Sequence, residues 1–99
     1  MKRRLLAVKP DTLNYIDNYE VSVARDYEDA RSQIVRAEEE GNSFDALDLN
    51  VSDENEFWDF VSWMEDTGRT YPFSVFGCNT FKFVKIRDIV RSRGFHFND

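Results

Sequence analysis

Short apolar segments alternate along this chain with amphipathic segments, and this alternation constrains the fold more than any other feature. Apolar runs of strand length occupy residues 4–8, 20–24, 44–49 and 72–76. Each of the last three runs is followed by a segment in which apolar residues recur every three or four positions, as they do in a half-buried helix. Strands that are connected through helices pair in parallel by right-handed crossovers. The pattern therefore predicts a parallel sheet covered by helices.

Each of the three predicted helices begins at a residue type that caps helices. Asp26 precedes the first and Asp53 the second, while Asn79 or Thr80 precedes the third. A glycine follows each helix and is expected to end it. The residues expected to face the core are Tyr27, Ala30, Ile34 and Ala37 in the first helix, Phe57, Phe60, Val61 and Met64 in the second, and Phe83, Ile86, Ile89 and Val90 in the third.

The fold expected from these elements is a single α/β domain over residues 1–99. A chain of 99 residues with 41% apolar side chains is of the right size for one domain with a modest core. We expect a three-layer sandwich of the receiver or flavodoxin type, with four parallel strands in the order 2-1-3-4. Residues 11–20 are expected to form a loop with one helical turn. Phe95 and Phe97 form a short fifth strand or simply pack against the sheet.

Charge is unevenly distributed along the chain. The net charge is −6, which argues against a general DNA-binding protein because such a protein needs a basic surface. Residues 26–66 contain fourteen acidic and two basic side chains, so the remainder of the chain is net basic. This segregation is typical of solvated helix faces, and it also fits a bipolar domain that steers a charged partner.

The cellular setting is expected to be the cytoplasm. The single Cys78 has no internal partner for a disulfide, which suits a reducing compartment. The basic N-terminus is followed by only four apolar residues, fewer than a signal peptide needs, and no apolar run is long enough to span a membrane. The chain also has no glycine-rich phosphate loop, zinc-ligand cluster or Ser/His/Asp arrangement, so no cofactor is expected.

In parallel α/β sheets, ligands bind in the crevice beyond the carboxyl ends of the strands. Asp48 is the main candidate there, because an exposed carboxylate can accept a phosphoryl group, hold Mg²⁺ or act as a general base. The alternative is that Asp48 only accepts hydrogen bonds from a neighbouring loop. The full set of residues expected to line the crevice is Lys9, Asp48, Leu49, Asn50, Gly77, Cys78 and Asn79.

Several residues near this crevice have two interpretations. Asn79 either caps the last helix or helps that helix terminus to attract an anion. Cys78 is expected to be a structural thiol. Trp58 flanks the inward face of the second helix and is a candidate anchor for a partner. The sequence leaves open whether the crevice is accessible or is filled by Phe76 and Phe81.

Residues 44–50, with the sequence FDALDLN, resemble the third strand of response-regulator receiver domains. A closer resemblance, over residues 43–95, is to the cyclic-phosphate processing receiver-like family. Residues 46–52 stand at the position of that family's Leu-Asp-His-Asp-Leu-Gly motif. Residues 75–80 stand at the position of its His-Ser-x-Asn-Pro motif, residues 58–72 resemble its third helix and the following turn, and residues 5–10 match its first strand.

The departures from the family pattern concern its chemistry. Asp48 and Asn79 keep the family residue, which makes them candidates for vestigial catalytic groups and makes Asp48 a weak candidate for binding metal. The acid–base and acidic positions of the family hold Leu49, Asn50 and Phe76, and the acidic pair after the first strand is replaced by Ala7 and Val8. A phosphotransfer role also lacks its hydroxyl residue, because Gly77 stands there. The resemblance therefore implies the fold and argues against the activity.

Three functions are consistent with the sequence. The leading hypothesis is a non-catalytic receiver-like module, or pseudoenzyme, that binds a protein partner or a phosphorylated nucleotide at the strand ends. A second is a diverged cyclic-phosphate phosphoesterase that uses Asp48 and Asn79. A third is a small acidic inhibitor, of the kind that phages encode, which binds a basic partner.

Overall fold

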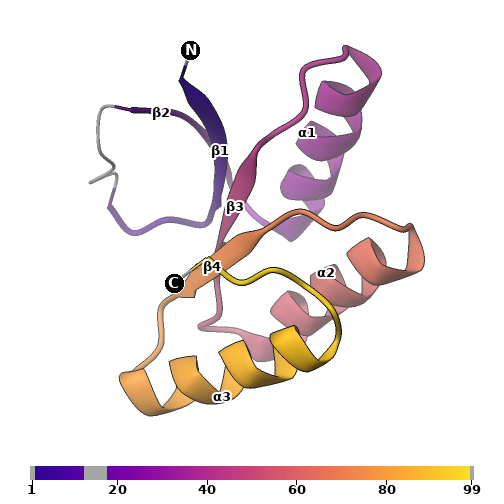
Figure 1. Ribbon diagram of the computed structural model, residues 1–99. Coiled ribbons are helices and arrows are strands. Elements are labelled where there is room, and N and C mark those ends of the chain that lie inside the picture. The colour runs from indigo at the N-terminus through magenta and orange to yellow at the C-terminus, as the bar shows by residue number, and fades with distance from the viewer. Residues whose placement is uncertain (1, 13–17, 99) are drawn as a thin grey trace.

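The four strands found in residues 2–12 and 18–98, the part of the chain that the computed structural model describes, form one parallel sheet (Figure 1). The α/β class and the strand order predicted from the sequence are confirmed, since every pair of neighbouring strands is parallel. In spatial order the strands are β2 (Tyr19–Ala24), β1 (Arg3–Val8), β3 (Ala46–Asn50) and β4 (Phe73–Phe76).

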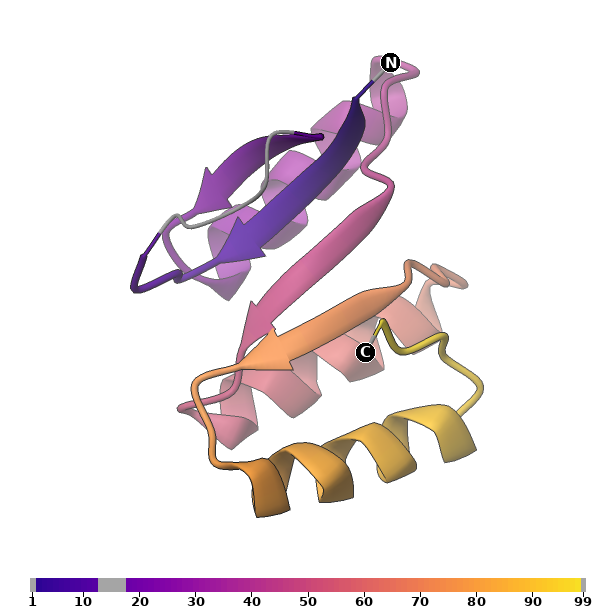
Figure 2. The same cartoon turned by 60° about the vertical axis from the view of Figure 1, so that its left-hand side comes forward.

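Helices α1 (Tyr27–Glu39), α2 (Glu54–Asp66) and α3 (Thr80–Ser92) pack against one face of this sheet. In Figure 2, α1 and α2 lie behind the strands and α3 runs beside α2. The helical turn predicted between β1 and β2 falls largely on residues 13–17, which lie outside the described residues. No helix in the described part of the chain is both long and apolar enough to cross a membrane.

The core is built from alternate strand positions and from the predicted faces of α1 and α2. Phe57 and Phe60 of α2 are fully buried, and the ring of Phe57 lies 6.1 Å from that of Phe73 on β4. The ring of Phe60 lies 5.1 Å from that of Tyr27 on α1, so the aromatic contacts join both helices and the sheet. The strand residues in this core are Leu6, Val8, Ala24, Leu47, Leu49, Phe73 and Val75.

The predicted inward face of α3 is only partly correct. Ile86 and Val90 are buried and Phe83 packs against the core, but Ile89 is 45% exposed. In Figures 1 and 2 this helix lies at one end of the helix layer, beyond α2, and the stripe that it buries is narrow. Ile89 lies beside this stripe, where it faces solvent.

The C-terminal segment after α3 returns to the sheet. Phe97 forms a single parallel bridge with Phe73, and both Phe95 and Phe97 are buried against the Phe73 ring. The fifth strand allowed by the sequence is thus one bridge long, and the two phenylalanines act mainly by packing.

An ion pair joins α1 to the loop that precedes β4. Arg69 donates to both carboxylate oxygens of Glu38, at 3.0 Å from Nε and 2.8 Å from Nη2, and the Tyr71 hydroxyl donates to the same carboxylate at 2.6 Å. These hydrogen bonds, first from Arg69 and then from Tyr71, lower the pKa of Glu38. The Arg69 guanidinium also lies 4.7 Å from the centre of the Trp63 ring, which extends the contact to α2.

Replacing Phe60 with alanine tests the assignment of the α2 core face. We expect Phe60→Ala to lower the free energy of unfolding by about 3–5 kcal/mol, because it leaves a cavity in a fully buried site. The matched control is Phe81→Ala, a change of the same size at a side chain that is 75% exposed, and it should alter stability by less than about 0.5 kcal/mol. Urea denaturation measures both, and equal losses would contradict the assignment.

The Glu38 contact predicts a particular pH dependence. Because the pKa of Glu38 is lowered by folding, its stabilising effect is present above the pKa of the unfolded chain and is lost as the pH falls through the folded pKa. The stability difference between the native chain and Glu38→Gln should therefore be largest near neutral pH and should shrink in acid. Urea denaturation across this range tests it, with the exposed Glu39→Gln as the control. A difference that stays constant with pH would contradict the prediction.

Candidate functional site

The carboxyl ends of β1 and β3 are held together by one buried amide side chain. Asn50, the last residue of β3, is 6% exposed. Its Nδ2 donates to the carbonyl oxygen of Lys9 at 2.8 Å, and its Oδ1 accepts from the backbone N–H and the hydroxyl of Ser52 at 2.8 and 2.6 Å. We call these three residues together with Gly77 the Asn50 network. It uses both polar atoms of the Asn50 side chain within the chain itself.

The backbone of the network has two unusual conformations. Gly77 follows β4 with φ +84°, and a Cβ atom built there would lie 3.0 Å from Asn50 Oδ1, so a larger residue would displace the amide. Lys9 has φ +55°, which few residues other than glycine adopt. The hydrogen bond from Asn50 satisfies the Lys9 carbonyl in this turn. The Asn50 side chain therefore adds to the backbone pairing of β1, β3 and β4 by joining the loops that follow these strands.

Tyr27 at the start of α1 also bonds to Asn50 at this edge of the sheet. Its hydroxyl donates to the Asn50 carbonyl oxygen at 2.5 Å, and the residue is buried. Burial, followed by the nearby carboxylates of Glu56, Asp48 and Asp53, raises the pKa of Tyr27 far above its ordinary value. The hydroxyl therefore remains a hydrogen-bond donor at every physiological pH.

Helix N-termini can bind anions through free backbone N–H groups, but here the three helices are capped by their own side chains. Asp26 accepts from the N–H of Asp29, and Asp53 accepts from the N–H of Asn55 at 3.0 Å. Asn79 accepts from the N–H of Lys82 at 2.8 Å. Two of these three caps are carboxylates, which repel an incoming phosphate.

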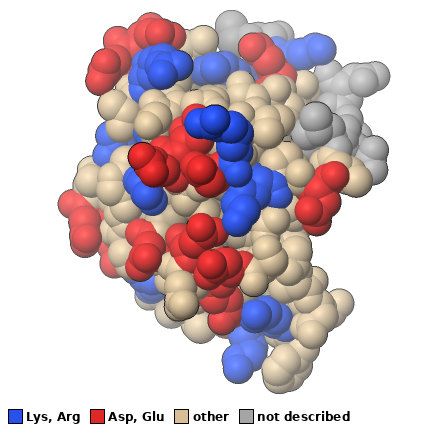
Figure 3. All heavy atoms as spheres, turned by 180° about the vertical axis from the view of Figure 1, so that it is seen from behind, with Lys and Arg blue, Asp and Glu red and all other residues tan. Residues whose placement is uncertain are grey.

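The same edge carries further negative charge between α1 and α2. A hollow of about 230 Å³ is lined there by Asp26, Tyr27, Glu28, Arg31, Glu56 and Asp59. Figure 3 shows the back of the molecule, where acidic side chains gather near the middle with basic ones among them. Lys9 Nζ, the cation nearest the end of β1, is paired with Glu56 at 3.0 Å. We call the six residues that line this hollow the acidic hollow.

Asp48 does not lie at the carboxyl edge. It stands in the middle of β3, opposite Ala7 on β1 and Ser74 on β4. Since Leu47 and Leu49 face the helices, Asp48 faces the other side of the sheet, where its Oδ1 accepts from the Ser74 hydroxyl at 3.1 Å. The strand continues two residues beyond Asp48, and Asn50 occupies the place at the edge that the sequence analysis expected Asp48 to fill.

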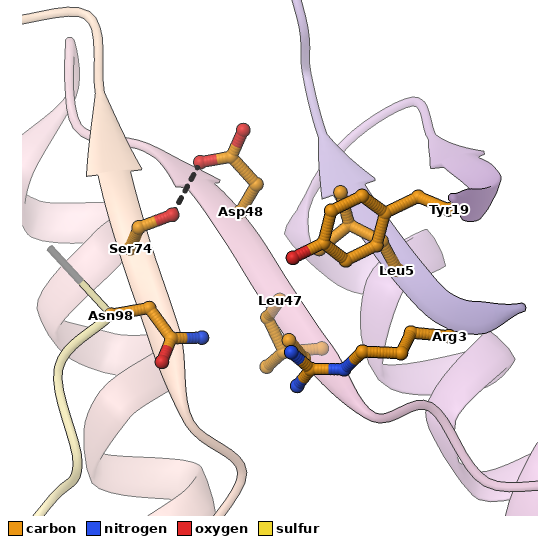
Figure 4. A pocket seen from close by; sticks show the side chains of 8 residues that line it. Arg3, Leu5, Tyr19, Leu47, Asp48, Ser74 and Asn98 are labelled. Atoms are coloured by element: carbon orange, nitrogen blue, oxygen red, sulfur yellow. Dashed lines mark hydrogen bonds between the residues drawn. The ribbon is translucent and has the colours of Figure 1, made fainter. Parts of the chain in front are cut away.

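Asp48 instead lines a hollow of about 400 Å³ on the face opposite the helices (Figure 4). Figure 4 shows Asp48, Ser74 and Asn98 on one side of this hollow, with Arg3 and Tyr19 on the other. The Arg3 guanidinium lies 5.8 Å from the centre of the Tyr19 ring. This arrangement was not predicted from the sequence. Arg3 and Leu5 were a signal for it, because side chains two residues apart in a strand lie on the same face of the sheet.

The remaining predicted site residues divide between the core and the surface. Leu49 is fully buried on the helix side, so it contributes no side chain to the crevice. Cys78 packs against the core, and burial raises the pKa of its thiol. Asn79 is an exposed helix cap. The structure thus brings Lys9, Asn50 and Gly77 together and leaves Asp48 and Leu49 outside that group.

Phe81 does not fill the crevice, since its side chain is 75% exposed on the first turn of α3. It borders a groove of about 530 Å³ between the N-terminal half of α2 and α3. We call this the α2–α3 groove, and its lining residues are Glu54, Trp58, Asn79, Phe81, Lys82, Lys85, Ile86 and Ile89. Trp58, the predicted partner anchor, is half-buried within it. The sequence did not indicate Lys85 or Ile89 as part of a surface, because Ile89 fitted the predicted core face.

Among the described residues, no group of three or more His, Cys, Asp or Glu side chains lies close enough together to hold a metal ion. Comparison of the chain with known protein families, with curated proteins and with solved structures found no match. The site is therefore interpreted from its own geometry.

Removing the Asn50 side chain tests whether the network holds the edge together. Asn50→Ala should lower the free energy of unfolding by about 1–3 kcal/mol, because the partly buried Lys9 carbonyl and Ser52 N–H lose their partner. Asn79→Ala, which removes an exposed cap, should cost about 1 kcal/mol and leave the network intact. Urea denaturation gives the two values, and amide chemical shifts of Lys9 and Gly77 should change only in Asn50→Ala. Unchanged shifts in that variant would refute the role of Asn50.

Proposed function

We propose that this chain is a non-catalytic α/β module that binds a protein partner at the carboxyl end of its sheet. The observation that carries the proposal is the contrast between two neighbouring features. The polar groups of the Asn50 network are satisfied within the chain, whereas Phe81, close to the same edge, is an aromatic side chain left 75% exposed. Exposed aromatic groups beside a groove are typical of protein-binding surfaces.

The positions that resemble the catalytic positions of the cyclic-phosphate processing family support a non-catalytic role. Ala7 and Val8 stand where that family has its acidic pair, and both are fully buried. Leu49 is buried in the core, and Asn50 is committed to the network. Asp48 keeps the family residue, but its carboxylate faces the opposite side of the sheet from the helices.

The charge around the strand ends favours a protein over a phosphorylated nucleotide. A phosphate needs cationic groups or free backbone donors. Here Lys9 is paired with Glu56, and Asp26 and Asp53 occupy two of the three helix N-termini. The acidic hollow adds further repulsion.

A nucleotide titration separates this proposal from a diverged phosphoesterase. With Mg²⁺ and ADP-ribose cyclic phosphate added to the isotope-labelled chain, we expect no saturable change in the backbone amides of Asn50, Gly77 and Asn79, and no hydrolysis. Saturable shifts at those amides, with turnover that is lost in Asp48→Ala and in Asn79→Ala, would overturn the proposal and establish the phosphoesterase.

Site-specific cross-linking supplies the positive test. A photoreactive phenylalanine analogue in place of Phe81 should form a discrete cross-linked product with a protein in cells that naturally produce the chain. The same analogue in place of Val23, which is 42% exposed on the distant edge strand β2, is the matched control. The absence of a product at position 81, or equal products at both positions, would contradict partner binding at this edge.

A second candidate function is an acidic inhibitor that binds a basic partner, and the acidic hollow is the observation that favours it. Its complex should dissociate steeply as salt is raised, because the attraction is between exposed charges. Reversing the charge of Glu28 and Asp59 should then weaken the complex, while Phe81→Ala should leave it unchanged. The two functions thus predict opposite responses of the complex to these variants.

A further inference from the structure

The α2–α3 groove combines an apolar floor with an exposed apolar rim. Trp58 from α2 and Ile86 from α3 lie within it, and Phe81 and Ile89 border it at 75% and 45% exposure. Phe81 and Ile89 are two turns apart on α3, so they lie on the same side of that helix. Lys85 lies one turn from each of them, so the rim presents two exposed apolar side chains with a lysine between them.

The packing of the chain does not account for the position of Phe81. The contact recorded for its ring is with Lys85, whose Nζ lies 5.7 Å from the ring centre. Trp58, by contrast, packs on Phe57 at 4.7 Å and has the Arg93 guanidinium 5.7 Å from its ring centre. One wall of the groove is thus fixed by the core, and the other is an aromatic group that is largely exposed.

The charges at the groove favour an acidic occupant. Glu54 is the acidic residue that lines it, and its carboxylate is paired with Lys82 across the groove at 3.4 Å. Lys85 stands on the rim and is exposed. The lining of the groove thus carries two lysines and one glutamate, and α3 as a whole has four basic residues and one acidic residue, in contrast to the acidic hollow beside α1.

A groove between two helices with apolar and charged sides suits an amphipathic helix, whose apolar residues recur at the spacing of successive turns. We propose that the α2–α3 groove binds an acidic amphipathic helix of a protein partner, with apolar side chains over Trp58, Phe81 and Ile89 and carboxylates facing Lys82 and Lys85. This inference rests on the proposed function, since it names the partner chemistry for binding at that edge of the domain.

Two synthetic peptides test the inference on the intact chain. Each is a capped helix of about 16 residues, long enough to be partly helical alone, with leucines along one face. One carries glutamates at the remaining positions and the other carries lysines. The glutamate peptide should cause saturable shifts at the amides of Trp58, Phe81, Lys85 and Ile89, and the lysine peptide should not bind the groove.

Variants of the chain separate apolar contact from charge. Phe81→Ala should weaken binding of the glutamate peptide by about tenfold, as expected for loss of a central aromatic contact. Reversing both Lys82 and Lys85 to glutamate should weaken it further and shift preference to the lysine peptide. The matched control is Val84→Ala, because Val84 is an exposed apolar residue of α3 that does not line the groove. The affinity of this variant for the glutamate peptide should stay within about twofold of that of the native chain.

Each other result has a defined meaning. No saturable shift, or equal binding of the two peptides, overturns the acidic helix as occupant. Shifts from the lysine peptide at Glu28 and Asp59 would favour the basic-partner function instead. Concentration-dependent sedimentation of the chain alone, lost in Phe81→Ala, would show that a second copy occupies the groove. The nucleotide titration is independent of these experiments. The peptides can therefore rule out an acidic helix in the groove while the non-catalytic module stands, and the titration can rule out the non-catalytic module whatever the peptides show.

Discussion

One buried amide, that of Asn50, joins the loops that follow the strands. A parallel sheet brings the loops after its strands to one edge, and their backbone polar groups need partners there. Asn50 meets this need by donating to the loop after β1 and accepting from the loop after β3, while its Oδ1 leaves room only for glycine at the end of β4. An amide can do this because it offers a donor and an acceptor at once, whereas a carboxylate at the same place would offer acceptors alone.

This closure has a consequence for chemistry at the edge. In sheets of this kind, the strand ends usually supply the groups that hold a ligand. Here those ends supply the groups that hold the loops, and two of the three helix N-termini are capped by carboxylates. The exposed apolar surface lies instead on the helices, where Phe81 and Ile89 face solvent. Under the proposed function, the scaffold recognises a partner by apolar contact rather than by binding an anion.

The fold could be predicted from the sequence because it follows from periodicity, which extends over many residues and tolerates small errors. The site could not, because it depends on where one strand ends. Placing the end of β3 at Leu49 made Asp48 a crevice residue, whereas the strand runs through Asn50 and turns Asp48 toward Ser74. Ile89 was misplaced for a related reason. Its spacing fits the core stripe of α3, but only the position of α3 outside α2 determines how wide that stripe is.

Charges of opposite sign lie on the two sides of this edge of the domain, and they can orient a charged partner. The acidic hollow lies where α1 and α2 begin, and the basic residues of α3 lie on the other side of α2. Glu54 and Lys82 meet between them as a pair at 3.4 Å, with both side chains about two-fifths exposed. A charged partner that approaches this edge is attracted by one side and repelled by the other, so its orientation is set before any apolar contact forms. For the acidic partner proposed above, specificity would arise from repulsion at the hollow as much as from attraction at the groove.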